Sequence, residues 1–159
     1  MKKNLKIILM LLLVPFAFSQ AEEKNAYKKQ KVVYHINYDN KKQQKGALGN
    51  IQNHINAVGA DNLEVRVVLH GNGLSLLVLP EALEKLTKFK SANADDNFTA
   101  RIDNLKNQGV AFDVCNNTVV GRKVNIDDDL YDVSESNIVP SGVAELVKLQ
   151  SEGFAYIKP

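Results

Sequence analysis

One cysteine and two histidines are the side chains of this sequence best suited to chemistry. Cys115 directly follows the apolar segment 110–114, and His35 and His70 each lie at the end of a segment rich in β-branched residues. A cysteine acts as a nucleophile when its pKa is low enough for the thiolate to form near neutral pH. A neighbouring imidazolium could hold such a thiolate or give a proton to a leaving group. Cys115 is therefore our candidate catalytic residue, and His70 and His35 are candidate substrate-binding residues.

Three polar residues after the cysteine, Asn116, Asn117 and Thr118, complete the candidate binding set. Asn and Thr are good N-cap residues, so they predict a short helix that continues to about Lys123. A sulfur atom at such a junction faces backbone N–H groups and the positive end of the helix dipole, which favour the thiolate. The alternative is a buried and inert cysteine that packs as a small hydrophobic side chain.

Short apolar segments typical of buried strands alternate with helical patterns along the chain. The expected strands are 32–36, 63–69, 110–114, 138–139 and 154–157. Parallel neighbours require crossover connections, so this alternation predicts a single α/β domain with a mainly parallel central sheet of about five strands flanked by helices. Ligands bind such sheets at the carboxyl ends of the strands. His35, His70 and Cys115 all lie at that edge.

Four helices are expected between these strands. In the first, apolar residues recur at three- and four-residue spacing from Leu48 to Val58, and Gly59 ends it. The second opens at Pro80 and has Leu83, Leu86 and Phe89 as its apolar positions; the third contains Phe98, Ile102 and Leu105 and is closed by Gly109; the fourth follows Pro140 and Ser141 and has Val143, Leu146 and Val147 on one face. The acidic segment 124–137 is expected to be irregular.

The first 21 residues have the features of a secretory signal peptide. Three lysines precede the apolar segment 7–18, and small residues follow it at a spacing that suits cleavage after Ala21. Residues 22–30 are expected to form a flexible lead-in, and residues 31–159 the α/β domain. We therefore expect an exported protein, located in the periplasm and not attached to the membrane once the signal is removed. A single thiol kept in an oxidising compartment favours a function for Cys115.

Composition and motifs exclude several classes of function. Of the 159 residues, 45% are hydrophobic and 24% are charged, which suits an ordinary globular domain and not a disordered chain. Without the three lysines of the leader, 17 basic side chains stand against 18 acidic ones, so nothing supports nucleic-acid binding. The sequence 71–73 lacks the third glycine of a nucleotide-binding loop, and 127–129 lacks the ligand spacing of a calcium loop. We expect no cofactor and no metal; a Cys/His metal site would need Cys115 and the histidines to converge.

Several segments together resemble the DsrE/DsrF-like family, in particular its exported branch. These segments are 32–36 (VVYHI), 67–71 (VVLHG), 109–118 (GVAFDVCNNT), 140–146 (PSGVAEL) and 149–157 (LQSEGFAYI). The resemblance implies a compact α/β domain with about five parallel strands, assembled as a homo-oligomer, commonly a trimer or hexamer. In the family's sulfur-relay members, a cysteine at the corresponding strand end accepts sulfur as a persulfide and passes it on. Cys115 occupies that position, although the Asn-Asn-Thr after it differs from the small residues of those proteins.

The resulting hypothesis is an exported sulfur-handling protein that carries sulfur as a persulfide on Cys115. Its partners would be a second copy of itself, a sulfur donor and a thiol acceptor. A single cysteine suits a carrier, because the transfer ends on another molecule and needs no resolving thiol. Two alternatives stay open: a non-catalytic small-ligand-binding or assembly protein of the same fold, and a one-cysteine redox sensor.

Overall fold

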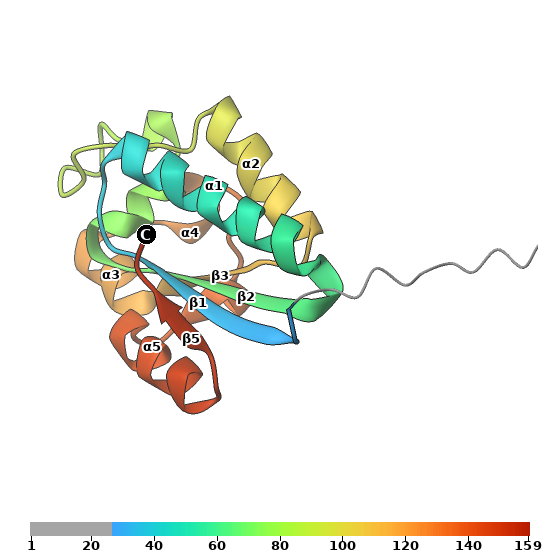
Figure 1. Ribbon diagram of the computed structural model, residues 1–159. Helices are drawn as coiled ribbons and strands as arrows, with labels where there is room; N and C mark the ends of the chain where they lie inside the picture. Colours follow the sequence, from blue (N-terminus) through green and yellow to red (C-terminus); the bar gives the residue numbers. More distant parts are fainter. Residues whose placement is uncertain (1–26) are drawn as a thin grey trace, which may run out of the picture.

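A sheet of five strands runs through residues 27–159, which are the part of the chain that the computed structural model describes (Figure 1). The strands are β1 (Gln30–Ile36), β2 (Leu63–Leu69), β3 (Ala111–Cys115), β4 (Ile138–Val139) and β5 (Ala155–Ile157). They lie in the order β4-β3-β2-β1-β5, and every neighbouring pair is parallel. The predicted α/β class with about five parallel strands is confirmed.

Helices cover the two faces of the sheet unequally. Figure 1 shows α1 (Lys41–Val58) and α2 (Asp96–Asn107) on one face and α5 (Gly142–Ser151) on the other. From β1 to β4 each strand is added on the same side of the one before, and the chain then returns to place β5 beside β1. Because parallel crossovers are right-handed, this reversal moves the last helix to the opposite face. Helix α5 packs there against β1, β2, β3 and β5.

Local sequence explains where the two long helices begin and end. The side chain of Asn40 accepts a hydrogen bond from the Gln43 N–H at the start of α1, and that of Asp95 caps α2. Helix α1 ends at Gly59, which has a φ of 86° that other residues rarely adopt. Both helices, and the glycine that ends the first, agree with the prediction from residue spacing.

The main hydrophobic core lies between the sheet and the α1/α2 layer. Alternate strand residues point into it, such as Ile36, Val67 and Phe112, each at most 1% exposed. Ile51 and Ile102 fill it from the two helices. A smaller apolar cluster lies on the α5 face and consists of Val33, Val68, Leu146, Leu149 and Phe154.

The helix predicted to open at Pro80 is wrong. Only Pro80–Ala82 form a 3₁₀ turn (η3), and the residues after it form turns. The preceding backbone pairs with a distant loop, since Val78 bridges Leu130 and the Tyr131 N–H donates to the Leu77 carbonyl. Leu76, Leu77 and Val78, directly before Pro80, are all fully buried, so three consecutive side chains enter the core there.

The predicted apolar face of the last helix is also wrong in part. Val143 and Val147 of α5 are 61% and 64% exposed. Leu146 and Leu149 are the residues that pack on the sheet, and Glu145 is buried beside them. Several apolar residues one turn apart allow more than one packing face, so their spacing did not determine which one is buried.

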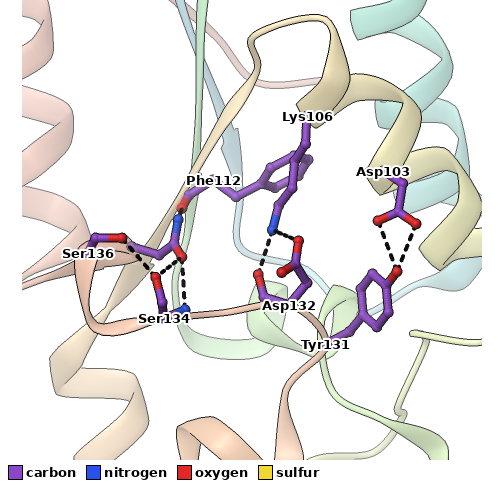
Figure 2. A network of polar contacts seen from close by, with 8 residues as sticks. Asp103, Lys106, Phe112, Tyr131, Asp132, Ser134 and Ser136 are labelled. Carbon is purple, nitrogen blue, oxygen red and sulfur yellow. Dashed lines mark hydrogen bonds and ion pairs between the residues drawn. The ribbon is translucent and has the colours of Figure 1, made fainter.

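Side chains of the acidic segment 124–137 hold it against the rest of the domain. It contains the one-turn helix α4 (Ile126–Asp129), whose Asp129 is buried and paired with Lys85. Figure 2 shows the next part: the Tyr131 hydroxyl donates to Asp103 of α2, and Lys106 of the same helix binds Asp132. Short β4 follows, as expected for 138–139.

The amino-terminal prediction is tested only in part. Strand β1 begins at Gln30, one residue before the expected start of the domain. The predicted signal peptide 1–21 and residues 22–26 of the lead-in lie outside the described residues. Within residues 27–159, no helix combines the length and apolar character that crossing a bilayer requires.

Candidate functional site

Cys115 lies where β3 passes into helix α3 (Asn116–Arg122), at the carboxyl edge of the sheet. It is itself the N-cap of α3, so Asn116, expected to help form the cap, is the first helical residue. The side chain of Cys115 is a free thiol in a residue that is 5% exposed. It lies on the α5 face of the sheet, because Phe112 and Val114 point into the opposite core and residues alternate along a strand.

Hydrogen-bond donors from two separate segments converge on the sulfur of Cys115. They are the backbone N–H groups of Gly142, Thr118 and Asn117 and the hydroxyl of Thr118. Burial of the thiol raises its pKa, and these donors lower it, with the result that the pKa of Cys115 falls below its ordinary value. The site therefore stabilises the thiolate, the reactive form of cysteine, relative to that of an ordinary cysteine.

Thr118 connects Cys115 to the end of the neighbouring strand. Its hydroxyl oxygen accepts a hydrogen bond of 2.8 Å from the N–H of Gly71, the residue after His70. The hydroxyl proton remains available for the Cys115 sulfur. Thr118 is buried, and this hydrogen bond links the segments that follow β2 and β3 at the carboxyl edge of the sheet.

Gly142, the first residue of α5, separates Cys115 from His70. A Cβ atom built on Gly142 would lie 3.2 Å from the Cβ of Cys115 and 3.0 Å from the Cβ of His70. Both contacts are tighter than carbon atoms normally make, so a side chain at this position would require Cys115 and His70 to shift by a few tenths of an ångström. The same close approach lets the Gly142 N–H reach the sulfur.

The structure brings His35 and His70 into contact. Their Nε2 atoms are 2.7 Å apart, and the Nδ1 of His35 lies 2.6 Å from the Tyr156 hydroxyl of β5. In the bond between the imidazoles one ring donates and the other accepts. A chain of polar groups therefore runs from the partly exposed Tyr156 through buried His35 to His70.

Both imidazoles favour the neutral form. Burial lowers the pKa of His35 to about 4, with further contributions from His70 and Lys158. Burial and then Lys158 lower the pKa of His70 as well. The groups that stabilise the thiolate are thus the N–H and hydroxyl donors, and the histidines line the site as neutral hydrogen-bonding groups.

Four charged residues lie on the same face of the sheet as Cys115. The Arg66 guanidinium makes a two-pronged ion pair with Asp113, two residues before the cysteine. It also approaches Glu145 of α5 at 3.9 Å, and Lys148 binds Glu145 at 3.0 Å. Burial raises the pKa of Asp113 against the opposing effect of Arg66. This cluster ties α5 to β2 and β3 and so supports the position of Gly142.

The predicted site residues differ in how they contribute. Cys115, Thr118, His70 and His35 lie together, whereas the side chains of Asn116 and Asn117 are exposed. The sequence analysis did not identify Gly142 and Tyr156. Both fall in segments that carry the family resemblance, but neither residue type by itself indicates a site. Within residues 27–159 no group of three or more His, Cys, Asp or Glu side chains is arranged to hold a metal ion.

The topology and the strand-end cysteine define an α/β protein with a thiol site at the carboxyl edge of a parallel sheet. The model of the DsrE/DsrF-like family matches residues 30–159, and the chain belongs to this family, whose members are generally related to sulfur relay. A solved structure of a protein of unknown function, MTH1491 from Methanobacterium thermoautotrophicum, is similar to it. That protein is 28% identical, with a TM-score of 0.64, and the match covers 82% of this chain and 99% of the other. No curated protein matches the chain.

Proposed function

We propose that the protein carries sulfur as a persulfide on Cys115 and transfers it to a thiol acceptor. The observation that supports this most is the convergence of four hydrogen-bond donors on the Cys115 sulfur, which lowers its pKa. Membership of a family related to sulfur relay agrees with it.

Each half of the reaction is a displacement at sulfur. The Cys115 thiolate attacks the sulfane sulfur of a donor, a new S–S bond forms, and the donor's leaving group departs with the electrons of the broken bond. The acceptor thiolate then attacks the outer sulfur, and Cys115 leaves as the thiolate. No external oxidant or reductant is required. His70, which stands beside Cys115 across Gly142, is available to bond the donor or the leaving group.

The proposal also includes the location of the protein, its partners and its oligomeric state. The features of residues 1–21 support export to the periplasm, and the lone cysteine supports a separate sulfur donor and thiol acceptor. A homo-oligomer, a trimer or a hexamer, is supported by the exposed valines of α5, Val143 and Val147. Light scattering on the purified protein measures the oligomer directly.

Intact-mass spectrometry tests the persulfide. The protein is incubated with polysulfide or thiosulfate beside Cys115→Ser, and each sample is measured before and after a reductant. We expect a gain of one sulfur atom that the reductant reverses and that the variant lacks. A folded protein that gains no sulfur, and whose Cys115 also resists alkylation, would contradict the proposal. A gain of oxygen from peroxide without stable sulfur would indicate the redox sensor instead.

A second candidate is an assembly or small-ligand-binding protein in which Cys115 only packs. Its support is the 5% exposure of Cys115 together with the exposed apolar residues Val120, Val143 and Val147. This candidate predicts that Cys115→Ser leaves the oligomer and the stability unchanged and that alkylation of the native thiol is slow. Rapid alkylation at neutral pH would count against it.

A further inference from the structure

Four side chains form a row across the α5 face of the sheet, one from each of the neighbouring strands β5, β1, β2 and β3 or from the residue that follows it. In this order they are Tyr156, His35, His70 and Cys115. Leu69 is opposite Val114 in the ladder between β2 and β3, and the backbone of the next residue, His70, is still extended. His70 and Cys115 therefore stand at the same level of adjacent strands and on the same face.

Hydrogen bonds join three members of this row into a chain. The Tyr156 hydroxyl lies 2.6 Å from Nδ1 of His35, and the Nε2 atoms of His35 and His70 are 2.7 Å apart. Each neutral imidazole carries one proton on its two nitrogens. All bonds of the chain must therefore point the same way, either toward Tyr156 or away from it. No hydrogen bond among residues 27–159 uses the Nδ1 of His70, so this atom is left for a ligand.

The two ends of the chain lie in different surroundings. Tyr156 is 42% exposed, so its hydroxyl can exchange a proton with water, whereas His35 is buried. At the other end, a Cβ atom built on Gly142 would lie 3.0 Å from the Cβ of His70 and 3.2 Å from that of Cys115. The chain thus connects the solvent with the immediate neighbour of the thiol. A thiol that attacks a sulfur bound to Cys115 has a proton to lose, because the thiolate is the nucleophile.

We propose that Tyr156, His35 and His70 form a proton relay for the thiol that attacks the loaded cysteine. This inference deepens the proposed function, on which it rests for the natural acceptor thiol. The acceptor's proton bonds to Nδ1 of His70 as its sulfur attacks. The Nε2 proton of His70 passes to His35, the Nδ1 proton of His35 passes to the Tyr156 oxygen, and the hydroxyl proton passes to water. All three groups stay neutral, and the hydrogen bonds reverse their direction. Protonation of the donor's leaving group in the other half of the reaction moves a proton the opposite way and restores the chain.

A coloured disulfide on Cys115 tests the relay without a persulfide. Dithiobis(nitrobenzoate) reacts with the thiolate to leave a mixed disulfide, and one coloured aryl thiolate departs with the electrons of the broken S–S bond. Free cysteine or sulfite then attacks the mixed disulfide and displaces the second aryl thiolate. Free cysteine, with a thiol pKa of about 8.5, must lose a proton near neutral pH, whereas the sulfite dianion has none to lose. The ratio of the two rates therefore reports proton removal and cancels changes in access to the site.

Tyr156→Phe removes the hydroxyl and keeps the ring beside His35. We expect the ratio of the cysteine rate to the sulfite rate to fall about 10-fold, a part of the roughly 10²–10⁴-fold effect of general acid–base catalysis, because His70 is retained. His35→Gln should lower the ratio at least as much, since an amide can bond to His70 but does not pass a proton on. The second variant separates proton transfer from a purely structural hydrogen bond.

Tyr34→Phe is the matched control. The Tyr34 hydroxyl lies 3.0 Å from Nδ1 of His54, so this variant also removes a bond between tyrosine and histidine, and its ring packs in the main core on the opposite face. Its ratio should equal that of the wild type. A wild-type ratio in Tyr156→Phe or in His35→Gln would overturn the relay, and so would an equal fall in the control. Failure of Cys115 to react with the reagent in the folded protein would overturn it too.

Sulfur loading from polysulfide, measured by intact mass in parallel, separates the two proposals. If the ratio depends on Tyr156 and His35 and the protein loads no sulfur, the relay stands and the persulfide function fails. If sulfur loads onto Cys115 and the ratio is the same in all variants, the persulfide function stands and the relay fails.

Discussion

The two faces of the sheet are built from the same strands and differ in almost every other respect. On the α1/α2 face, alternate residues such as Val67 and Phe112 are apolar and fully buried. On the α5 face the intervening positions include His35, Asp113 and Cys115, which are also buried. Burial there costs free energy unless each polar group has a partner. In this structure Tyr156, Arg66 and the N–H of Gly142 are those partners.

The main hydrophobic core and the candidate site therefore lie on opposite faces of the sheet. The α1/α2 face carries the larger hydrophobic core, and burial of apolar side chains is the main favourable contribution to folding. The α5 face has an apolar cluster of only five residues, and its buried polar and charged groups include the residues of the candidate site. A substitution on one face should therefore change one property and leave the other nearly unchanged.

The largest expected effect is on stability, from the core of the α1/α2 face. Ile102 of α2 is fully buried, and Ile102→Ala should lower the free energy of unfolding by about 2–5 kcal/mol. Urea denaturation measures this loss. The pKa of Cys115, taken from alkylation rates against pH, should stay at its wild-type value. A change in both quantities would show that the two faces are not independent.

A smaller effect is expected from the pH dependence of stability on the α5 face. The folded pKa of His35 is about 4, below the value of about 6.5 in an unfolded chain, so the folded state binds fewer protons. Its contribution is present above pH 6.5 and is lost as the pH falls from about 6.5 to about 4. We expect His35→Asn to reduce this acid-dependent loss by about 1–2 kcal/mol, measured by urea denaturation across that range. Parallel curves for both proteins would contradict this assignment.

The smallest effect is expected in the pKa of the Cys115 thiol. In Gly142→Ala the new methyl group meets His70 and Cys115, and the N–H moves away from the sulfur. The pKa of Cys115 should rise by about half a unit, and alkylation near neutral pH should slow in proportion. The control is Gly46→Ala in α1, where a Cβ atom meets nothing within 4 Å. An unchanged pKa in Gly142→Ala would remove Gly142 from the set of effective donors.

Residue spacing predicted the elements that place the site. Strand β2 was expected at 63–69 and has those bounds, and β1, β3 and β5 differ from expectation by one or two residues at their ends. Their branched and aromatic residues form short apolar segments with clear ends. Because all strands are parallel, their carboxyl ends share one edge, so His70 and Cys115 could be expected to meet.

The remaining features depended on tertiary contacts. Every residue except proline has a backbone N–H, so neither residue type nor spacing marks that of Gly142 as a donor to Cys115. Tyr156 reaches His35 only because β5 returns to the β1 edge, and strand order was not evident from the sequence. The residues directly before Pro80 pair with the Leu130 loop, and those after Ala82 form turns in place of the expected helix.

The dependence of the thiol on Gly142 also has a consequence for the newly made chain. Gly142 follows Cys115 by 27 residues and belongs to the helix that packs last in sequence order, just before β5. Until that helix docks, Cys115 lacks its distant donor and behaves more like an ordinary cysteine. An unfinished or unfolded chain would thus hold its thiol largely protonated and slow to react. Docking of α5 onto the sheet would then be the folding step that lowers the pKa of Cys115.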